Sequence, residues 1–268
     1  MAINTLAAAT IFQQQLDKIA VQDAVTGWMD ANAGQVKYNG GAEVKIPKMS
    51  VQGMGDYDRD NGYQKGSVTL EYETRKMTQD RGRKFQIDPM DVDESNFIPT
   101  AAAIMAEFQR TQVTPEIDAY RISKIASEVI TANKAGMVEY NYTPGGTGTS
   151  ALRKVKEGIK AVRSSYNGPL VIHTFSQGGI NTTVPGIDNV PIISTPTNRM
   201  YTAITVYDGK TGGQEAGGYT KGSKAKDINF LVIPRTTPIA ITKQDIMRIF
   251  DPLTNQNANA WAMDYRRY

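Results

Sequence analysis

An alternation of apolar and polar residues over residues 68–75 predicts a β-strand with two chemically different faces. The apolar side carries Val68, Leu70 and Tyr72, and the polar side carries Thr69, Glu71 and Glu73. A period of two is typical of a strand whose successive side chains point to opposite faces. A preceding run at residues 44–49 supplies a partner strand, and the link between the two runs is rich in glycine and aspartate. The pattern therefore predicts a long two-stranded ribbon.

This ribbon has no evident neighbour in the sequence. A two-stranded ribbon alone is at best marginally stable in water. One interpretation is a solvated hairpin that lies on its own domain. The other is an extended arm that becomes ordered by lying on an adjacent copy of the same protein.

Helical spacing of apolar residues predicts three helices in the first half of the chain. The first lies near residues 11–20, and a second begins at Pro99 and carries Ile104, Met105 and Phe108 on one face. The longest runs to about Ala132, with Thr114 as its cap and Pro115 in its first turn. Its apolar stripe is expected at Ile117, Tyr120, Ile125 and Val129. A short strand is expected at residues 84–88.

The second half alternates helices and strands. A helix is predicted at residues 152–162, buried strands at 170–172 and 228–233, and a hairpin-like run at 190–194. A glycine-rich excursion covers residues 209–222. This order indicates a compact α+β domain over about residues 151–233. The strand-like segment 238–268 is expected to return and pack near the longest helix.

Composition narrows the chemistry. The 268 residues include no cysteine and a single histidine, His173, and the formal net charge is +3. Disulfides and thiolate metal sites are excluded, and most zinc sites and histidine general bases with them. No secretory signal pattern and no apolar run of membrane-spanning length is present, which favours a soluble protein that stays in its cell of synthesis.

Three clusters could carry chemistry, and each has a simpler interpretation. Residues 217–224 resemble a phosphate-binding loop, but the order of lysine and hydroxyl residue is wrong, so no cofactor is expected. His173, Ser176 and Asp188 have the residue types of a hydrolase triad, although a histidine after a buried strand is more often structural. The carboxylates of residues 88–94 suit calcium, but they also suit a helix amino terminus. No catalytic or metal site is assigned.

Several phrases of the sequence resemble one protein family. They are Lys45-Ile46-Pro47-Lys48, Gly55-Asp56-Tyr57-Asp58-Arg59, Gln79-Asp80-Arg81, Phe85-Gln86-Ile87-Asp88, Asp91-Val92-Asp93-Glu94, the run from Val113 to Tyr120, and the ending from Ala260 to Tyr268. Together they are similar to the major capsid proteins of tailed double-stranded DNA bacteriophages, over most of the chain.

The resemblance implies an α+β chain with the Hong Kong ninety-seven type capsid fold. Residues 1–40 would form an amino-terminal arm, and 41–95 an extended hairpin called the E-loop with its flanking strands. Residues 96–150 would form a peripheral domain with a long spine helix, 151–233 an axial domain, and 234–268 a return to the peripheral domain. The ribbon predicted from the alternation then corresponds to the E-loop.

The implied function is structural and not enzymatic. Copies of the chain would assemble in the host cytoplasm into the pentamers and hexamers of an icosahedral virion shell. The shell would enclose double-stranded DNA, which it would bind non-specifically. A separate scaffolding protein and a portal would be further partners, and no membrane would be involved. Interspersed charges suit a subunit contact better than a phosphate groove. The interface is expected to involve Asp56, Tyr57, Arg59, Lys65, Glu71, Glu73, Arg75, Lys76, Arg81, Arg83 and Lys84.

Two alternatives remain open. The same fold occurs in encapsulin-type compartments, which enclose an enzyme cargo. A member of a different class, a serine hydrolase, would use Ser176 and His173.

Overall fold

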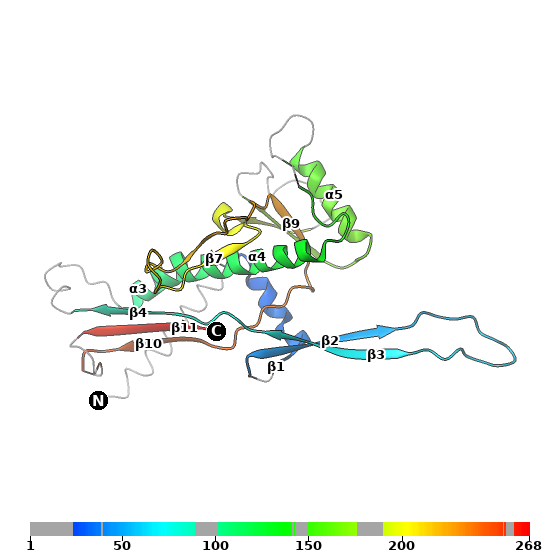
Figure 1. Ribbon diagram of the computed structural model, residues 1–268, viewed down its shortest axis with the longest axis horizontal. Helices are drawn as coiled ribbons and strands as arrows, with labels where there is room; N and C mark the ends of the chain where they lie inside the picture. The colour runs from blue at the N-terminus through cyan, green and yellow to red at the C-terminus, as the bar shows by residue number, and fades with distance from the viewer. Residues whose placement is uncertain are drawn as a thin grey trace.

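The computed structural model describes residues 24–38, 40–88, 101–140, 142, 150–175, 190–253, 255 and 260–268. Figure 1 shows an elongated molecule in which a long helix lies between a lower layer of strands and an upper domain, while a ribbon extends far from the body on one side. The helix predicted near residues 11–20, the start of the helix at Pro99, Ser176, Asp188 and the carboxylates after Asp88 lie outside the described residues.

The extended ribbon consists of β2 (Glu43–Val51) and β3 (Val68–Lys76). The two strands pair antiparallel over their whole length, from Glu43 opposite Lys76 to Val51 opposite Val68. The short strand β1 (Lys37–Tyr38) pairs with β2 at the base of the ribbon. The predicted strands and their pairing are therefore present.

A second three-stranded sheet lies in the lower layer, in the order β10-β11-β4. Its strands are β4 (Arg81–Ile87), β10 (Asp245–Phe250) and β11 (Trp261–Arg267), all antiparallel. Met247, Met263 and Tyr265 form a core with Met105 of α3 (Ala101–Phe108). The carboxyl-terminal segment therefore returns to the helical layer as expected, but β4 belongs to this sheet and not to the ribbon.

The long helix does not start afresh at Thr114. Helix α3 continues through a π-helical turn, η2 (Gln109–Val113), into α4 (Thr114–Ala132), and Thr114 has helical backbone angles. Pro115 has no N–H to donate, and its ring crowds the preceding turn, so a widened turn lets the helix pass a proline without stopping. Thr114 as a cap was therefore wrong, while the end at Ala132 is confirmed.

The most buried face of α4 also differs from the expected stripe. Ala119 and Ile122 are fully buried, whereas Ile117 and Ile125 are only half-buried. The buried face contains two alanines and an aspartate, which a search for large apolar residues passes over. The expected stripe instead points partly into a groove described below.

Asp118 on this buried face joins three parts of the chain. It is fully buried, and its carboxylate accepts hydrogen bonds from the backbone N–H groups of Val25, at 3.1 Å, and Thr26, at 3.0 Å. The guanidinium of Arg199, from η3 (Thr197–Arg199), lies 2.8 Å away. One helix turn later Arg121 pairs with Asp30 of η1 (Gly27–Gln35), at 2.7 Å.

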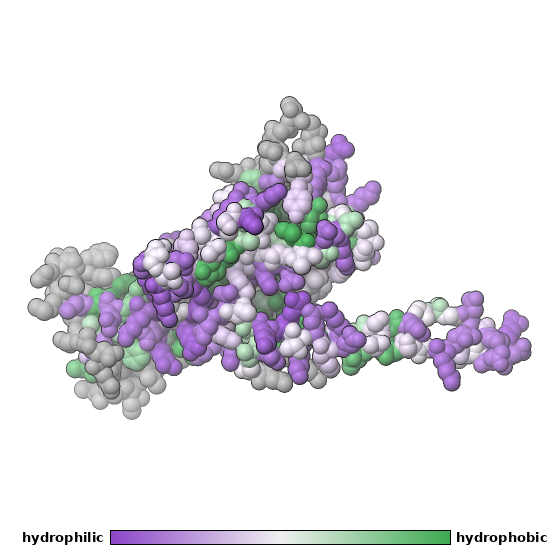
Figure 2. Space-filling model, viewed as in Figure 1, coloured by the Kyte–Doolittle hydropathy of each residue, from purple (hydrophilic) through white to green (hydrophobic). Residues whose placement is uncertain are grey.

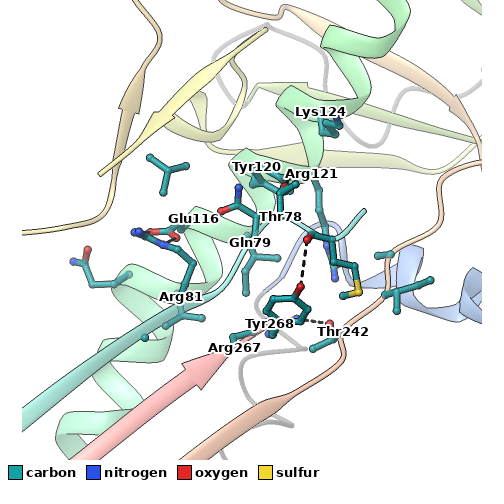
Figure 3. Close-up of a pocket in the computed structure, with 18 of the residues that line it drawn as sticks. Thr78, Gln79, Arg81, Glu116, Tyr120, Arg121, Lys124, Thr242, Arg267 and Tyr268 are labelled. Atoms are coloured by element: carbon teal, nitrogen blue, oxygen red, sulfur yellow. Dashed lines mark hydrogen bonds and ion pairs between the residues drawn. The ribbon is translucent and has the colours of Figure 1, made fainter. Parts of the chain in front are cut away.

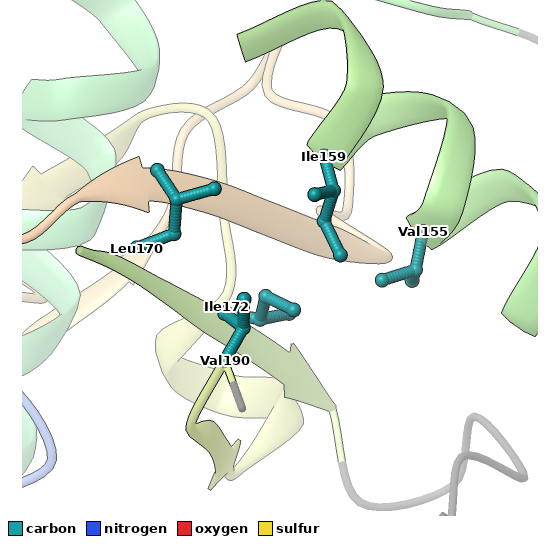
Figure 4. Packing of buried hydrophobic residues seen from close by; sticks show 5 residues of the cluster. All are labelled: Val155, Ile159, Leu170, Ile172 and Val190. Atoms are coloured by element: carbon teal, nitrogen blue, oxygen red, sulfur yellow. The ribbon is translucent and has the colours of Figure 1, made fainter. Parts of the chain in front are cut away.

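The upper domain is an α+β unit. Its sheet has the order β6-β5-β9, formed by β5 (Leu170–Phe175), β6 (Ile192–Thr195) and β9 (Phe230–Pro234). Helix α5 (Ala151–Arg163) begins where the Ser150 side chain accepts a hydrogen bond from the Arg153 N–H. Val155 and Ile159 of α5 pack on Leu170 and Ile172 of the sheet, as Figure 4 shows. β6 runs parallel to β5, so the expected hairpin-like run is instead a parallel neighbour of the central strand.

The glycine-rich excursion forms a hairpin of β7 (Ile204–Val206) and β8 (Tyr219–Lys221). Residues 217–224 thus enter a strand instead of opening a helix, and a phosphate-binding loop needs the helix. The resemblance to such a loop has no structural counterpart.

Candidate functional site

The ribbon separates apolar from charged side chains onto its two faces. Residues directly opposite each other in an antiparallel pair share a face, so the cross-strand pairs define each side. The apolar face consists of Pro47 opposite Tyr72, Met49 opposite Leu70, and Val51 opposite Val68. Met49 is 71% exposed and Leu70 57%, and the other four are exposed as well. No described part of the chain covers this face.

The opposite face carries ion pairs that form between residues of the same chain. Glu73 accepts from both Lys48 and Arg75, and the hydrogen bond from Lys48 is the main reason that the pKa of Glu73 lies below its usual value. Arg75 also reaches Glu128 of α4 at 3.3 Å. Two of the expected interface residues, Glu73 and Arg75, are thus already paired inside the subunit.

The tip of the ribbon has its own local structure. Tyr57 and Tyr63 meet edge to face with ring centroids 5.0 Å apart, and both are exposed. The Asp58 carboxylate accepts from Asn61 and from the Asp60 N–H, and these bonds lower the pKa of Asp58. Gly62 has φ of +81°, a backbone conformation that favours glycine. Asp56, Arg59 and Lys65 are exposed around this turn, and Lys76 is exposed at the ribbon base.

The three basic residues that follow the ribbon lie on β4 and not on the extended arm. Both Nε and Nη2 of Arg81 donate to the Glu116 carboxylate of α4, at 2.7 and 3.0 Å, and Nη1 donates to the Tyr207 carbonyl at 2.6 Å. Arg83 donates to the Glu215 carbonyl at 3.0 Å, and Lys84 lies opposite Asp264 in the sheet. Arg81 and Arg83 tie β4 to the helix and to the β7–β8 hairpin, so neither is displayed on an arm that reaches a neighbour.

A groove of about 600 Å³ lies between α4, the ribbon base and the carboxyl-terminal strand. Figure 3 shows Arg81 and Glu116 along one side of it, and Tyr268 at another, donating to the Met77 carbonyl at 3.3 Å. Ile117 contributes to its apolar lining. The sequence analysis missed this groove, because it forms between segments far apart in the chain. Ile117 and Ile125, which the sequence analysis placed on the apolar stripe of the longest helix, both line it.

His173 is a structural residue in the centre of the upper sheet. It is fully buried; its Nε2 accepts from the Trp28 Nε1–H at 3.2 Å, and its Nδ1 lies 3.1 Å from the Thr195 hydroxyl. Burial lowers the pKa of His173 to about 4. With both ring nitrogens engaged and no access to solvent, His173 is not placed to act as the base of a serine hydrolase.

The described part of the chain contains neither a metal-binding cluster nor a membrane-spanning helix. No cluster of three or more carboxylate or histidine side chains is arranged to hold a metal ion. None of the helices in that part is both long and apolar enough to cross a bilayer.

Comparison with known proteins gives a structural likeness without a sequence match. No family model and no curated protein matches the chain. A structure from Mycobacterium phage Che8 is similar with a TM-score of 0.52 and 11% identity, over 85% of this chain and 79% of that chain.

Two further structures have TM-scores below 0.5. A virus-like particle from Pyrococcus furiosus has a TM-score of 0.47 and 11% identity, over 92% of this chain and 89% of that chain. The mature capsid of bacteriophage PhiM1 has a TM-score of 0.46 and 11% identity, over 85% and 77%. The predicted α+β class is confirmed, and the likeness to the Che8 phage structure is one of fold.

Proposed function

We propose that this chain is a major capsid protein of a tailed phage, which assembles with copies of itself into the pentamers and hexamers of an icosahedral shell enclosing double-stranded DNA. Its role is structural, without catalysis, and its place is the virion after assembly in the host cytoplasm. A separate scaffolding protein and a portal are the expected further partners. The fold shared with the Che8 phage structure supports this proposal.

The observation that carries the proposal is the uncovered apolar face of the ribbon. Soluble monomers rarely expose contiguous apolar patches, and larger ones mark interaction sites. Six apolar side chains lie side by side on this face, and the ribbon holding them projects away from the body (Figure 1). An arm of this kind gains stability by lying on another molecule, and a second copy is the partner that a shell provides.

The free energies of apolar burial and of exposed ion pairs indicate that the apolar face, and not the charges, would supply most of the binding energy. Burying an exposed side chain of this size contributes about 1.5–3 kcal/mol, whereas an exposed ion pair contributes about 0–1 kcal/mol. The Glu73 pairs with Lys48 and Arg75 are moreover already formed within the subunit. The apolar face would therefore supply affinity, and exposed charges such as Glu71, Lys76 and Arg59 would set orientation.

Two cross-strand double variants separate these contributions. Met49→Ser/Leu70→Ser removes the central pair of the apolar face, and Lys48→Ser/Glu71→Ser removes the neighbouring pair on the charged face. Sedimentation velocity of the purified proteins is expected to show large particles for the wild type and for the charged-face variant. The apolar-face variant is expected to remain as small species with an unchanged circular dichroism spectrum.

Normal particles from the apolar-face variant would contradict the proposed contact. Loss of particles from the charged-face variant alone would show that a mixed-sign clasp dominates. An encapsulin-type compartment would form particles of the same kind around a protein cargo, and the nucleic-acid content of particles isolated from an infected host separates it from a phage head.

A further inference from the structure

Helix α5 concentrates positive charge, as residues 75–84 also do, but Arg75 and Arg81 of that other segment are paired with glutamates of the same chain. It contains five basic residues and one acidic residue, a net charge of +4, while the whole chain has a net charge of +3. The remainder of the chain is therefore slightly acidic. A polyanion would be attracted to this helix more strongly than to the chain as a whole.

The basic residues of α5 follow one stripe on its outer side. Val155 and Ile159 face the sheet and are buried, whereas Arg153, Lys156, Lys160 and Arg163 are exposed. Spacings of three and four residues place these four side chains along one side of a helix. In Figure 2 hydrophilic side chains project from α5 into solvent, at the upper right of the molecule.

Three of these cations are unpaired in the described part of the chain. The ion pairs of α5 join Glu157 to Arg153 at 3.1 Å, and Lys154 to Glu157 at 3.1 Å and to Glu139 at 2.6 Å. Glu157 is therefore neutralised by its own helix. Lys156, Lys160 and Arg163 belong to none of these pairs, and their charge is available to a partner.

The stripe has the dimensions of a segment of duplex backbone. From Arg153 to Arg163 the helix rises about 15 Å, which spans about two or three phosphates along one strand. The charge on this stripe is uniformly positive once Glu157 is compensated, unlike the mixed signs on the ribbon. Uniform positive charge is what a phosphate backbone requires, whereas a contact between copies suits mixed signs.

We infer that the outer face of α5 binds the phosphate backbone of duplex DNA without sequence specificity, through Lys156, Lys160 and Arg163. The inference rests on the proposed function, which supplies the DNA as cargo. It requires that α5 face the interior of the shell. A shallow hollow of about 380 Å³ is lined by Lys156 and Lys160 together with Glu157, whose carboxylate is paired with Arg153, so a phosphate has room to approach both ammonium groups.

The test measures binding of the unassembled full chain, at concentrations below those at which particles form, to a fluorescein-labelled 20-base-pair duplex by anisotropy, in 25 to 200 mM KCl. Three phosphate contacts predict that the logarithm of the binding constant falls with the logarithm of salt with a slope of about −2.7, a loss of roughly 40-fold between 50 and 200 mM. The variant Lys156→Gln/Lys160→Gln/Arg163→Gln should lose this binding and the slope with it.

A matched control removes the same charge elsewhere. Lys210, Lys224 and Arg248 are exposed and lie outside α5, so Lys210→Gln/Lys224→Gln/Arg248→Gln has the same net charge as the test variant. This control should bind DNA as the wild type does. Equal losses in both variants, or wild-type binding by the α5 variant, would overturn the inference.

Electron microscopy of the same proteins, at the higher concentrations at which particles form, separates this inference from the proposed function. Shells from the α5 variant together with lost DNA affinity are the expected result. A wild-type chain that binds DNA with the predicted slope but forms no shell would refute the proposed function alone. Shells whose α5 variant binds DNA like the wild type would refute the inference alone.

Discussion

Replacing Asp118 by alanine is expected to destabilise the whole subunit. The carboxylate is fully buried and is the shared acceptor for Val25, Thr26 and Arg199. Breaking a buried ion pair by removing one partner costs about 3–5 kcal/mol, because the other charge stays buried without compensation. A domain has about 5–15 kcal/mol of total stability, so this loss is a large fraction of it.

A double-mutant cycle isolates the ion pair. Asp118→Ala, Arg199→Ala and the double variant are unfolded with urea, and tryptophan fluorescence is followed, because Trp28 lies two residues after the segment that Asp118 holds. The double variant should be more stable than the sum of the single losses predicts, by about 1–3 kcal/mol. Glu107→Ala serves as the control, since its pair with Arg110 is exposed on the same continuous helix and should cost at most about 1 kcal/mol.

Strictly additive losses in this cycle would refute the reasoning, because they would mean that Asp118 and Arg199 do not depend on each other. A loss at Asp118 no larger than that of Glu107→Ala would refute the buried junction altogether.

Three further predictions concern positions inside the subunit. Because burial lowers the pKa of His173 to about 4 from an unfolded value near 6.5, the unfolded chain binds a proton in this window and the folded chain does not. Stability is therefore complete above about pH 6.5 and falls by about 3 kcal/mol toward pH 4, and urea unfolding of His173→Gln across this range should show a flatter dependence. Ile122→Ala should lower the free energy of unfolding by about 2–5 kcal/mol because Ile122 is fully buried, and Ile117→Ala in the groove should lower it clearly less in the same assay. Equal losses would mean that the buried face of α4 has been assigned wrongly. A Cβ at Gly82 would lie 2.8 Å from the Tyr265 carbonyl oxygen, so Gly82→Ala should push β4 away from β11 and lower the stability by about 1–3 kcal/mol. The amides of β4 should then exchange hydrogen faster, and unchanged exchange would count against this close approach.

Local periodicity predicted the ribbon, α4, α5 and the central strand of the upper sheet. In α5 and the central strand the apolar residues are also the buried ones, whereas in α4 and the ribbon the pattern predicted the element but not which face is buried. The period of two at residues 68–75 marks the two faces of β3, and Val155 and Ile159 mark the inner side of α5. Such signals lie within one segment and need no knowledge of the rest of the chain.

Features that depend on long-range pairing were not predictable in this way. Arg81 and its neighbours follow the ribbon directly in sequence, yet β4 pairs with β11, about 180 residues later. The charges of Arg81 and Arg83 therefore look like part of an exposed arm until Glu116 and the β7–β8 hairpin are placed beside them. The passage of the helix through Pro115 was missed for a different reason, because a proline usually marks a helix start and a π-helical turn has no sequence pattern.

The most direct test of the account is a cryo-electron microscopy reconstruction of the particles that the purified wild-type chain forms. The account predicts closed icosahedral shells built from pentamers and hexamers, in which the Met49 and Leu70 face of each ribbon is buried against a neighbouring copy. A protein that remains a monomer over the full concentration range, or shells in which this face stays exposed to solvent, would contradict it.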